Sequence, residues 1–582
     1  MNTADYIIKK LEELGINEFF GVPGDYNFNL LDRIEKNPNT RWIGCTSELN
    51  AGYAADGYAR LRGYGALVTT YGVGELSAIN AVAGSFAENV PVCHIVGLPS
   101  SKNIENKALL HHNFQEPDYK TFLKTFENVT AASTFLARDN AKLEIDRVLR
   151  VMVKEKKPVY IAIPSDIALM DISERYTALD WDSDKDTLKE AAELIADKIN
   201  NSQRPVIIGD VLIKRFEAKI DFQEFVSKSG IPVTNFLMGT NIINSDYENY
   251  LGGYFGDFEN KNAKEYIEKS DCIIAVGTIE SDLNTFGCKL SKKLNDNIAI
   301  YGTYTFIDGK KYDNIKMSNL LESVTELIDA RNIKIKKSNL GYEPATANSE
   351  QLTSSYIYPR IQEFLKENDI VIAETGCIPG GIGQIKFPNN VDVHLQVLWG
   401  STGWATPAAL GAGLAKSNAR IILITGEGAH QLSAMETGNM LRQNIRPVVI
   451  VINNDGYTTE RYLCGNKDAE YNDIVKMNYS KFARTFEGDI WATRILTPDD
   501  FDKALKVTQI MNKMCYIEAC TDKTDIPDLT RKMTDSARRT NADEPIPETM
   551  HKEIDLKEIS LSSDSKFEYE TVVHQGLKKE GK

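Results

Sequence analysis

Two adjacent histidines stand out, because the chain contains only seven histidines in 582 residues. His111 and His112 follow an apolar run in the stretch NKALLHHNF, residues 106–114. Imidazole is the side chain whose unperturbed pKa lies nearest physiological pH, so such a pair can hold and pass protons. Adjacent side chains point to opposite faces of a strand and diverge on a helix, so a polar loop or a helix end also explains the pair. The pair alone leaves both interpretations open.

A second group of residues has the composition of a phosphate and cation site. The strand-like run RIILIT ends in a turn that contains Glu427 and Gly428, and the run VVIVIN ends close to Asn454 and Gly456. In a right-handed βαβ unit the two turns lie at the same sheet edge, and the N–H groups of the helix that follows suit phosphate. One carboxylate, one amide oxygen and one carbonyl are ligands of the kind that Mg²⁺ prefers. Either turn alone is ordinary; together they indicate a diphosphate and Mg²⁺ site.

The elements that must position these residues can be traced from short apolar runs that end in glycine, proline or asparagine. Uniformly apolar runs with helical patterns between them predict parallel sheets that helices cover on both faces. The runs are GALVTTYG, VCHIVGLP, KPVYIAIP, RPVIIGD, DCIIAVG, DIVIAETG, RIILITGEG and RPVVIVINND. The helical patterns include AADGYARLR, KEAAELIADKIN and AMETGNMLRQN, and MNTADYIIKKLEELG predicts an N-terminal amphipathic helix. The predicted fold class is α/β, with three doubly wound parallel-sheet domains.

Two polar stretches, residues 174–187 and 334–351, divide the chain because they lack apolar periodicity. The length also favours several domains, since single cores stop growing at roughly 250–300 residues. We predict domains over residues 1–180, 188–335 and 350–530, followed by a C-terminal helix and polar extension over residues 531–582.

Composition argues against several classes of partner. The net charge of −15 and the pI of about 5.2 argue against nucleic acid or an anionic membrane as the main partner. The first residues lack the pattern of a secretory signal, and no apolar run approaches the ~20 residues of a membrane span. The eight cysteines are scattered, which indicates reduced thiols. These features predict a cytoplasmic protein without a nucleic-acid or membrane partner.

The paired turns resemble the diphosphate-binding motif of thiamine diphosphate enzymes, and the likeness extends over about residues 3–530. In chain order, GVPGDYNFNLLD, SELNAGYAADGYAR, HHNF, ETG, WGSTGW, GEGAHQLSAMETGNMLR and NNDGYTTERYLCG look like the pyruvate and indolepyruvate decarboxylase group. The resemblance implies a pyrimidine-binding, a central and a diphosphate-binding domain, in the order of the predicted domains. It also implies non-oxidative decarboxylation of a 2-oxo acid to an aldehyde and CO₂, through a ylid and an enamine of thiamine diphosphate, with Mg²⁺ as the metal.

The same resemblance assigns the residues that move protons. Glu48 matches the glutamate that hydrogen-bonds the aminopyrimidine ring and promotes formation of the ylid. Asp25, His111, His112 and Glu460 match the group that supplies protons for the enamine and for aldehyde release. In this family the cofactor lies between the pyrimidine domain of one subunit and the diphosphate domain of another. The resemblance therefore implies a homodimer or homotetramer with active sites at the subunit interface.

Further positions match contacts to the cofactor and its metal. The implied metal ligands are Glu427, Asn454 and Gly456. The implied cofactor-binding residues are Glu48, Thr375, Gly400, Thr402, Glu427, Gly428, Ala429, Asn454, Gly456 and Tyr457. The metal-binding acid is usually Asp, so Glu427 predicts weaker Mg²⁺ binding. Thr402 stands where a bulky aliphatic residue usually wedges the cofactor into its bent shape, which weakens the expected wedge.

A third departure concerns the substrate. After Glu374-Thr375-Gly376 the family places aromatic side chains that restrict the pocket, whereas this chain continues with CIPGG, residues 377–381. The loss of an aromatic side chain predicts room for a bulky 2-oxo acid such as phenylpyruvate or indolepyruvate, or a branched-chain one. Thr459 lines the same pocket by resemblance. Pyruvate as the substrate, carboligation to acyloins, and a non-catalytic cofactor-binding relic stay open as alternatives.

Overall fold

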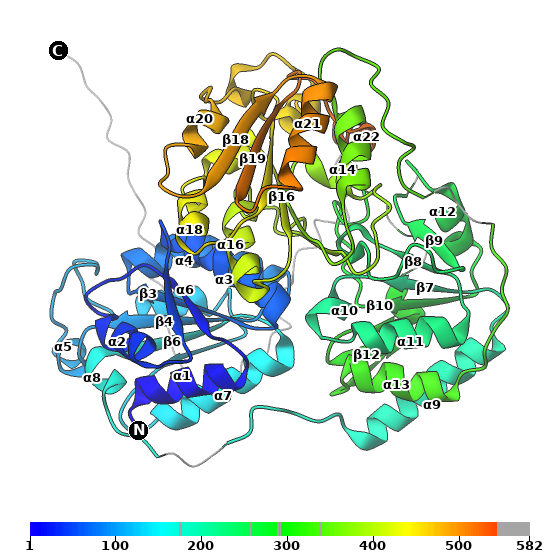
Figure 1. The fold of residues 1–582 in the computed structure, drawn as a ribbon. Helices are drawn as coiled ribbons and strands as arrows, with labels where there is room; N and C mark the ends of the chain where they lie inside the picture. The colour runs from blue at the N-terminus through cyan, green and yellow to red at the C-terminus, as the bar shows by residue number, and fades with distance from the viewer. Residues whose placement is uncertain (174–176, 257, 288–289, 291–292, 337–339, 544–582) are drawn as a thin grey trace, which may run out of the picture. The chain divides into compact units, whose positions relative to one another are not determined.

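The computed structural model describes residues 1–173, 177–256, 258–287, 290, 293–336 and 340–543. Within it, Met1–Arg538 form one compact unit that contains three β-sheets, each flanked by helices (Figure 1). The predicted α/β class with three parallel-dominated sheets is confirmed. The polar extension predicted beyond residue 543 lies outside the described residues. No helix within the described ranges is both long and apolar enough to cross a lipid bilayer.

The first sheet has six parallel strands in the order β2-β1-β3-β4-β6-β5. Its strands are β1 Glu18–Gly21, β2 Arg41–Gly44, β3 Gly65–Thr70, β4 Val92–Leu98, β5 Ala132–Phe135 and β6 Val159–Pro164. Its helices are α1 Thr3–Glu13, α2 Phe28–Lys36, α3 Glu48–Arg62, α4 Val73–Ala87, α5 Ser101–Glu105, α6 Thr121–Phe126, α7 Ala141–Glu155 and α8 Ser165–Ala168. Strand β3 is buried at every position, as expected for an apolar run with helices on both faces.

The second sheet has seven strands in the order β13-β12-β11-β10-β7-β8-β9, and among the described residues only β12 runs antiparallel to both of its neighbours, β11 and β13. Its strands are β7 Pro205–Gly209, β8 Val233–Asn235, β9 Tyr250–Gly253, β10 Cys272–Val276, β11 Ile298–Ile300, β12 Tyr304–Ile307 and β13 Lys310–Asp313. Its helices are α9 Lys185–Asn201, α10 Leu212–Arg215, α11 Lys219–Ser229, α12 Lys261–Glu268 and α13 Met317–Leu327. The antiparallel pair makes this sheet mixed rather than purely parallel.

The third sheet, in the order β15-β14-β16-β17-β19-β18, repeats the topology of the first. Its strands are β14 Ile370–Ala373, β15 Asp392–Leu395, β16 Ile421–Gly426, β17 Val448–Asn453, β18 Ile490–Ile495 and β19 Met514–Cys520. Its helices are α14 Ser354–Phe364, α15 Ile378–Ile382, α16 Ala405–Ala415, α17 Glu427–Gln431, α18 Glu436–Arg442, α19 Thr458–Leu463, α20 Tyr479–Ala483, α21 Pro498–Thr508 and α22 Asp528–Asp543. Gly426 pairs with Ile452 across parallel β16 and β17, so the two motif turns leave the same edge of the sheet.

Helices α3 and α16 join the first and third sheets through glycines. A Cβ atom on Gly57 would lie 2.3 Å from the Ala408 carbonyl oxygen, and one on Gly411 would lie 1.9 Å from the Ala54 carbonyl oxygen. The two backbones therefore approach more closely than any side chain permits. This contact fixes the position of α3, which begins at Glu48.

Candidate active site

A cavity of about 100 Å³ lies where β14, β16 and β17 of the third sheet end. Nine of the residues predicted from the sequence line it: Thr375, Thr402, Glu427, Gly428, Ala429, Asn454, Gly456, Tyr457 and Glu460. They come from segments up to 85 positions apart in the chain, and the carboxyl ends of neighbouring parallel strands bring them together. The cavity is therefore the part of the fold in which the predicted diphosphate and Mg²⁺ chemistry is concentrated.

Glu427 is the charged centre of this cavity. Its side chain is buried, and one carboxylate oxygen accepts a hydrogen bond from the Gly456 N–H at 2.6 Å. The Asn454 carboxamide lies 3.3 Å from both carboxylate oxygens. Burial raises the pKa of Glu427 to about 7, and among the described residues no lysine or arginine forms an ion pair with it. A buried carboxylate beside amide and carbonyl oxygens suits a hard divalent cation, so the residues present fit Mg²⁺.

The turn that carries Asn454 and Gly456 is held by a buried arginine that the motif did not single out. Gly456 has a φ of +137°, and a Cβ atom there would lie 2.5 Å from the Arg461 guanidinium. Arg461 donates hydrogen bonds to the Asp455 and Lys467 carbonyls at 3.0 and 2.8 Å, and to Asp473 at 2.6 Å. Only glycine permits this close approach, so Gly456 and Arg461 form one structural unit.

Glu374 connects the segment of the predicted cofactor residue Thr375 with the start of α16, just after Thr402. The buried Glu374 carboxylate accepts hydrogen bonds from the Thr375 N–H at 3.1 Å and from the Ala405 N–H, in the first turn of α16, at 3.2 Å. Burial raises its pKa to about 7. Gly400 adopts a φ of +66° in the loop before α16 but does not line the cavity. Glu374 thus ties the end of β14 to the loop that carries Thr402.

Asp25, His111 and His112 form a second group, in the first domain. His111 Nε2 lies 3.0 Å from Asp25 Oδ2, and the nearest ligand atoms of all three side chains lie within 4.8 Å of one another. The two imidazole centroids are 4.4 Å apart. Burial, followed by the neighbouring His111, lowers the pKa of His112 below its usual value. The adjacent histidines therefore share one environment with a carboxylate, as a proton-transfer group requires.

The backbone explains why two adjacent rings face the same carboxylate. His112 has a φ of +70°, a left-handed conformation that is uncommon for a residue with a side chain. The Tyr71 hydroxyl donates to the His111 carbonyl, and a Cβ atom on Gly72 would lie 2.0 Å from the His112 carbonyl oxygen. The turn between β3 and α4 thus holds the histidine loop and brings together side chains that a regular strand or helix would separate.

Glu48 lies at neither place. It is the first residue of α3, directly after the N-cap Ser47, and its carboxylate lies 3.2 Å from the position of a Cβ atom on Gly74. Asp25, Glu48, His111 and His112 are all described, and none of them lines the cavity of the third domain. Within a single chain, the cavity of the third domain is therefore lined without the four predicted residues of the first domain.

The sequence matches known proteins over nearly the whole chain. Residues 1–122, 192–327 and 374–519 match the family models for the N-terminal TPP-binding, central and C-terminal TPP-binding domains of thiamine pyrophosphate enzymes. A pyruvate decarboxylase of Aspergillus fumigatus is 35% identical over 560 residues, covering 93% of this chain and 98% of its own. The chain belongs to the thiamine diphosphate-dependent 2-oxo acid decarboxylase family.

Two further family members show the breadth of this similarity. Pyruvate decarboxylase isozyme 1 of Saccharomyces cerevisiae is 34% identical over 523 residues, covering 86% of this chain and 91% of its own. An alpha-keto-acid decarboxylase of Mycobacterium leprae is 33% identical over 551 residues, covering 92% and 95%. These similarities support an enzyme that acts on 2-oxo acids. The first and third domains are thiamine diphosphate-binding domains.

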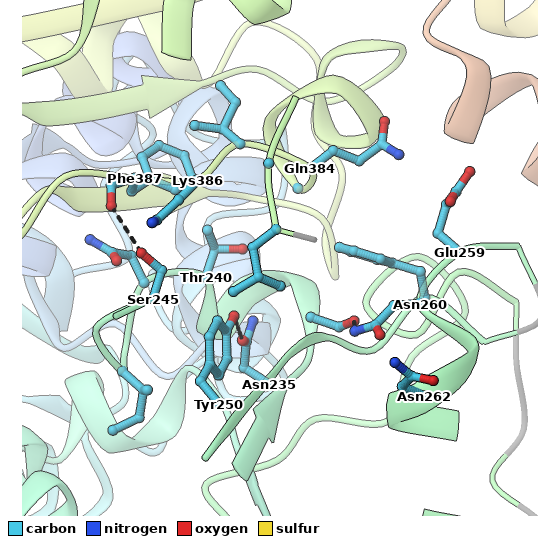
Figure 2. Close-up of a pocket in the computed structure, with 18 of the residues that line it drawn as sticks. Asn235, Thr240, Ser245, Tyr250, Glu259, Asn260, Asn262, Gln384, Lys386 and Phe387 are labelled. Carbon is cyan, nitrogen blue, oxygen red and sulfur yellow. Dashed lines mark hydrogen bonds between the residues drawn. The ribbon is translucent and has the colours of Figure 1, made fainter. Parts of the chain in front are cut away.

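A larger cavity, of about 510 Å³, is lined by residues of the second domain and of the segment after α15 (Figure 2). Its wall includes Tyr250, whose hydroxyl donates to Asn235 at 2.6 Å, and Ser245, whose hydroxyl donates to the Phe387 carbonyl at 3.4 Å. None of the predicted site residues, all of which are described, lines it. Gly383, which lines it, follows α15 directly, whereas Cys377 and Ile378 at the other end of α15 line the smaller cavity. The chemistry of the lining, not the volume, identifies the smaller cavity as the candidate active site.

Sequence reasoning missed several residues of the candidate site. Ser354, Tyr358, Asp525 and Pro527 line the cavity but belong to no recognised motif. They reach it from α14 and from the segment before α22, both distant in sequence from the cofactor turns. Cys377, by contrast, follows a motif, and its thiol lies 2.9 Å from the Thr459 hydroxyl. Burial raises the pKa of Cys377 to about 12, so the thiol is neutral and acts as part of the wall.

Proposed function

We propose that this protein decarboxylates a 2-oxo acid without oxidation, releasing an aldehyde and CO₂, with thiamine diphosphate and Mg²⁺ as cofactors. The observation that carries the proposal is that nine sequence-predicted residues line one cavity around the buried Glu427. Glu427, Asn454 and Gly456 would hold Mg²⁺. Bound thiamine diphosphate supplies the carbon nucleophile and the electron sink for loss of CO₂.

The chain's own residues supply the proton movements. Glu48 exchanges a proton with the aminopyrimidine ring, and Asp25, His111, His112 and Glu460 deliver protons to the product side. The 3.0 Å contact between Asp25 and His111 supports this role, because a carboxylate holds the imidazole in position for transfer. The lowered pKa of His112 favours its neutral ring, so this imidazole is free to take up a proton and pass it on.

We further propose that the functional unit is a homodimer or a homotetramer, with each site between two subunits. Within one chain the cavity of the third domain lacks the four predicted residues of the first domain, which supports this assembly. Apolar side chains also lie exposed beside both groups: Val73 and Leu76 in the first turns of α4, and Leu432 and Met435 after α17. Val73 and Leu432 are 56% and 57% exposed. Exposed apolar patches of this kind mark protein–protein contacts, and a second copy would cover them.

A coupled aldehyde assay tests the reaction. The full-length protein, loaded with thiamine diphosphate and Mg²⁺, is offered pyruvate, branched-chain 2-oxo acids, phenylpyruvate and indolepyruvate separately. We expect aldehyde from at least one acid, and a loss of at least about 100-fold in Glu48→Gln with cofactor binding retained. Activity unchanged in Glu48→Gln would refute the assigned role. Acyloin formation from an aldehyde pair faster than aldehyde release would favour the carboligase alternative, and cofactor binding without turnover would favour the relic.

The proposed decarboxylase can act on either of two classes of substrate, which differ in size. The segment CIPGG at residues 377–381 predicts a bulky aromatic or branched acid, whereas the relatives named pyruvate decarboxylase favour pyruvate. The same assay separates them through the ratio of kcat/KM values.

A further inference from the structure

The wall of the candidate active site contains a tyrosine that has no part in the proton transfers proposed above. Tyr358, in α14, lines the cavity together with Cys377 and Thr459. Its side chain is 1% exposed, and among the described residues its hydroxyl has no hydrogen-bond partner. A hydroxyl in a cavity wall that has no protein partner is available to a ligand in that cavity.

The ring of Tyr358 lies over the backbone of α15. A Cβ atom on Gly381 would lie 2.3 Å from two ring carbons of Tyr358, Cε1 and Cζ. A Cβ atom on Gly380 would likewise lie 2.1 Å from the Thr530 hydroxyl oxygen. No side chain fits at either position, so the two glycines allow Tyr358 and Thr530 to pack directly on α15. The glycines of CIPGG therefore mark close packing and do not leave an empty pocket.

Helix α15 is also fixed in place, so it does not move aside for a larger substrate. The Thr530 hydroxyl donates to the Cys377 carbonyl at 2.9 Å, at the start of the helix. The Tyr342 hydroxyl donates to the Gly381 carbonyl at 2.9 Å, at its end. Because hydrogen bonds hold both ends of α15, the side chains that pack against this helix determine the space next to Cys377. Tyr358 is the largest of these side chains in the cavity wall.

We propose that Tyr358 is the specificity-determining residue of this site, and that its ring restricts the enzyme to small 2-oxo acids such as pyruvate. The proposal rests on the decarboxylase function proposed above and names its substrate class. It reverses the prediction from CIPGG, because the aromatic ring absent after Glu374-Thr375-Gly376 is replaced by one that reaches the same wall from α14.

The test compares the ratio of kcat/KM for phenylpyruvate to kcat/KM for pyruvate in the wild type and in Tyr358→Leu. We expect the wild type to prefer pyruvate and the variant to raise the ratio about tenfold or more, because the smaller side chain opens the wall. Tyr356→Leu is the matched control. Tyr356 lies on the same helix and is equally a buried tyrosine, but its hydroxyl donates to Asp502 at 3.0 Å and it does not line the cavity. The control should leave the ratio unchanged.

Three results would overturn the proposal: a wild type that already prefers phenylpyruvate, an unchanged ratio in Tyr358→Leu, or an equal rise in the Tyr356→Leu control. If the leucine variant does not fold, Tyr358→Met replaces it, since the flexible thioether yields to a bulky acyl group. Circular dichroism and thiamine diphosphate binding establish that each variant is folded. Absence of aldehyde from every acid in the wild type refutes the proposed function itself, and is thus distinct from a failed specificity test.

Discussion

Replacing Glu75 by glutamine should stabilise the protein, and by more at high pH. Glu75 is fully buried in α4, where one carboxylate oxygen accepts from the Gly72 N–H at 2.7 Å and the other from the Tyr160 hydroxyl at 2.7 Å. Burial raises its pKa from 4.5 to about 7. Glutamine keeps both contacts, because its amide oxygen accepts from Gly72 and its amide nitrogen donates to the Tyr160 oxygen.

The magnitude follows from proton linkage. Between pH 4.5 and 7 the folded state keeps the proton on Glu75 and the unfolded state has lost it, so the wild type loses stability as pH rises through this window. At about 1.4 kcal/mol for each pKa unit, the full effect is about 3 kcal/mol at pH 8. At pH 6 it is about 2 kcal/mol, because part of the titration remains incomplete. Glu75→Gln does not titrate and should be more stable by these amounts.

Urea unfolding of the wild type and Glu75→Gln, side by side at pH 6 and pH 8, measures both differences. Glu75→Ala is the control, since it removes the charge and both hydrogen bonds and should destabilise the protein at either pH. A glutamine variant less stable than the wild type at pH 8, or a difference independent of pH, would refute the reasoning. The result bears on function because Gly72, which Glu75 holds, packs against the His112 carbonyl.

Two further predictions concern the helix contact and the metal. Gly57→Ala should lower the free energy of unfolding by about 1–3 kcal/mol, because the added Cβ atom clashes with the backbone of Ala408. Gly44→Ala is the control and should change the free energy of unfolding far less, because the nearest neighbour of its Cβ atom lies 3.4 Å away. Equal losses of stability in urea unfolding would contradict this prediction. Glu427→Asp should tighten the Mg²⁺-dependent binding of thiamine diphosphate severalfold, and Glu427→Gln should weaken it at least tenfold. Fluorescence titration measures both affinities. Equal affinities in the wild type and both variants would show that Glu427 does not bind the metal.

The cofactor half of the candidate site could be predicted because it depends on local rules. Strands β16 and β17 are recognisable as apolar runs, and adjacent parallel strands in a βαβ unit deliver their following turns to one edge. Glu427, Asn454 and Gly456 therefore meet wherever the two strands pair. The three α/β sheets follow from the same alternation of apolar runs and helices.

Other features depend on contacts between segments that no local pattern connects. The left-handed backbone at His112, which turns both imidazoles toward Asp25, is imposed by Tyr71 and Gly72 from another part of the domain. Tyr358 reaches the cavity only because Gly381 lets its ring pack on α15.

Sequence alone thus determined the fold class, the family and the motif residues, because hydrophobic periodicity and turn chemistry act over a few neighbouring residues. Tertiary structure alone decided which side chains share a cavity. It leaves Glu48 and the histidine pair outside the cavity that Glu427 lines in one chain, and it packs the ring of Tyr358 against Gly381 in the wall of that cavity. The physical reason is that close packing fills any space that glycines open, and the neighbour that fills it is set by the whole fold.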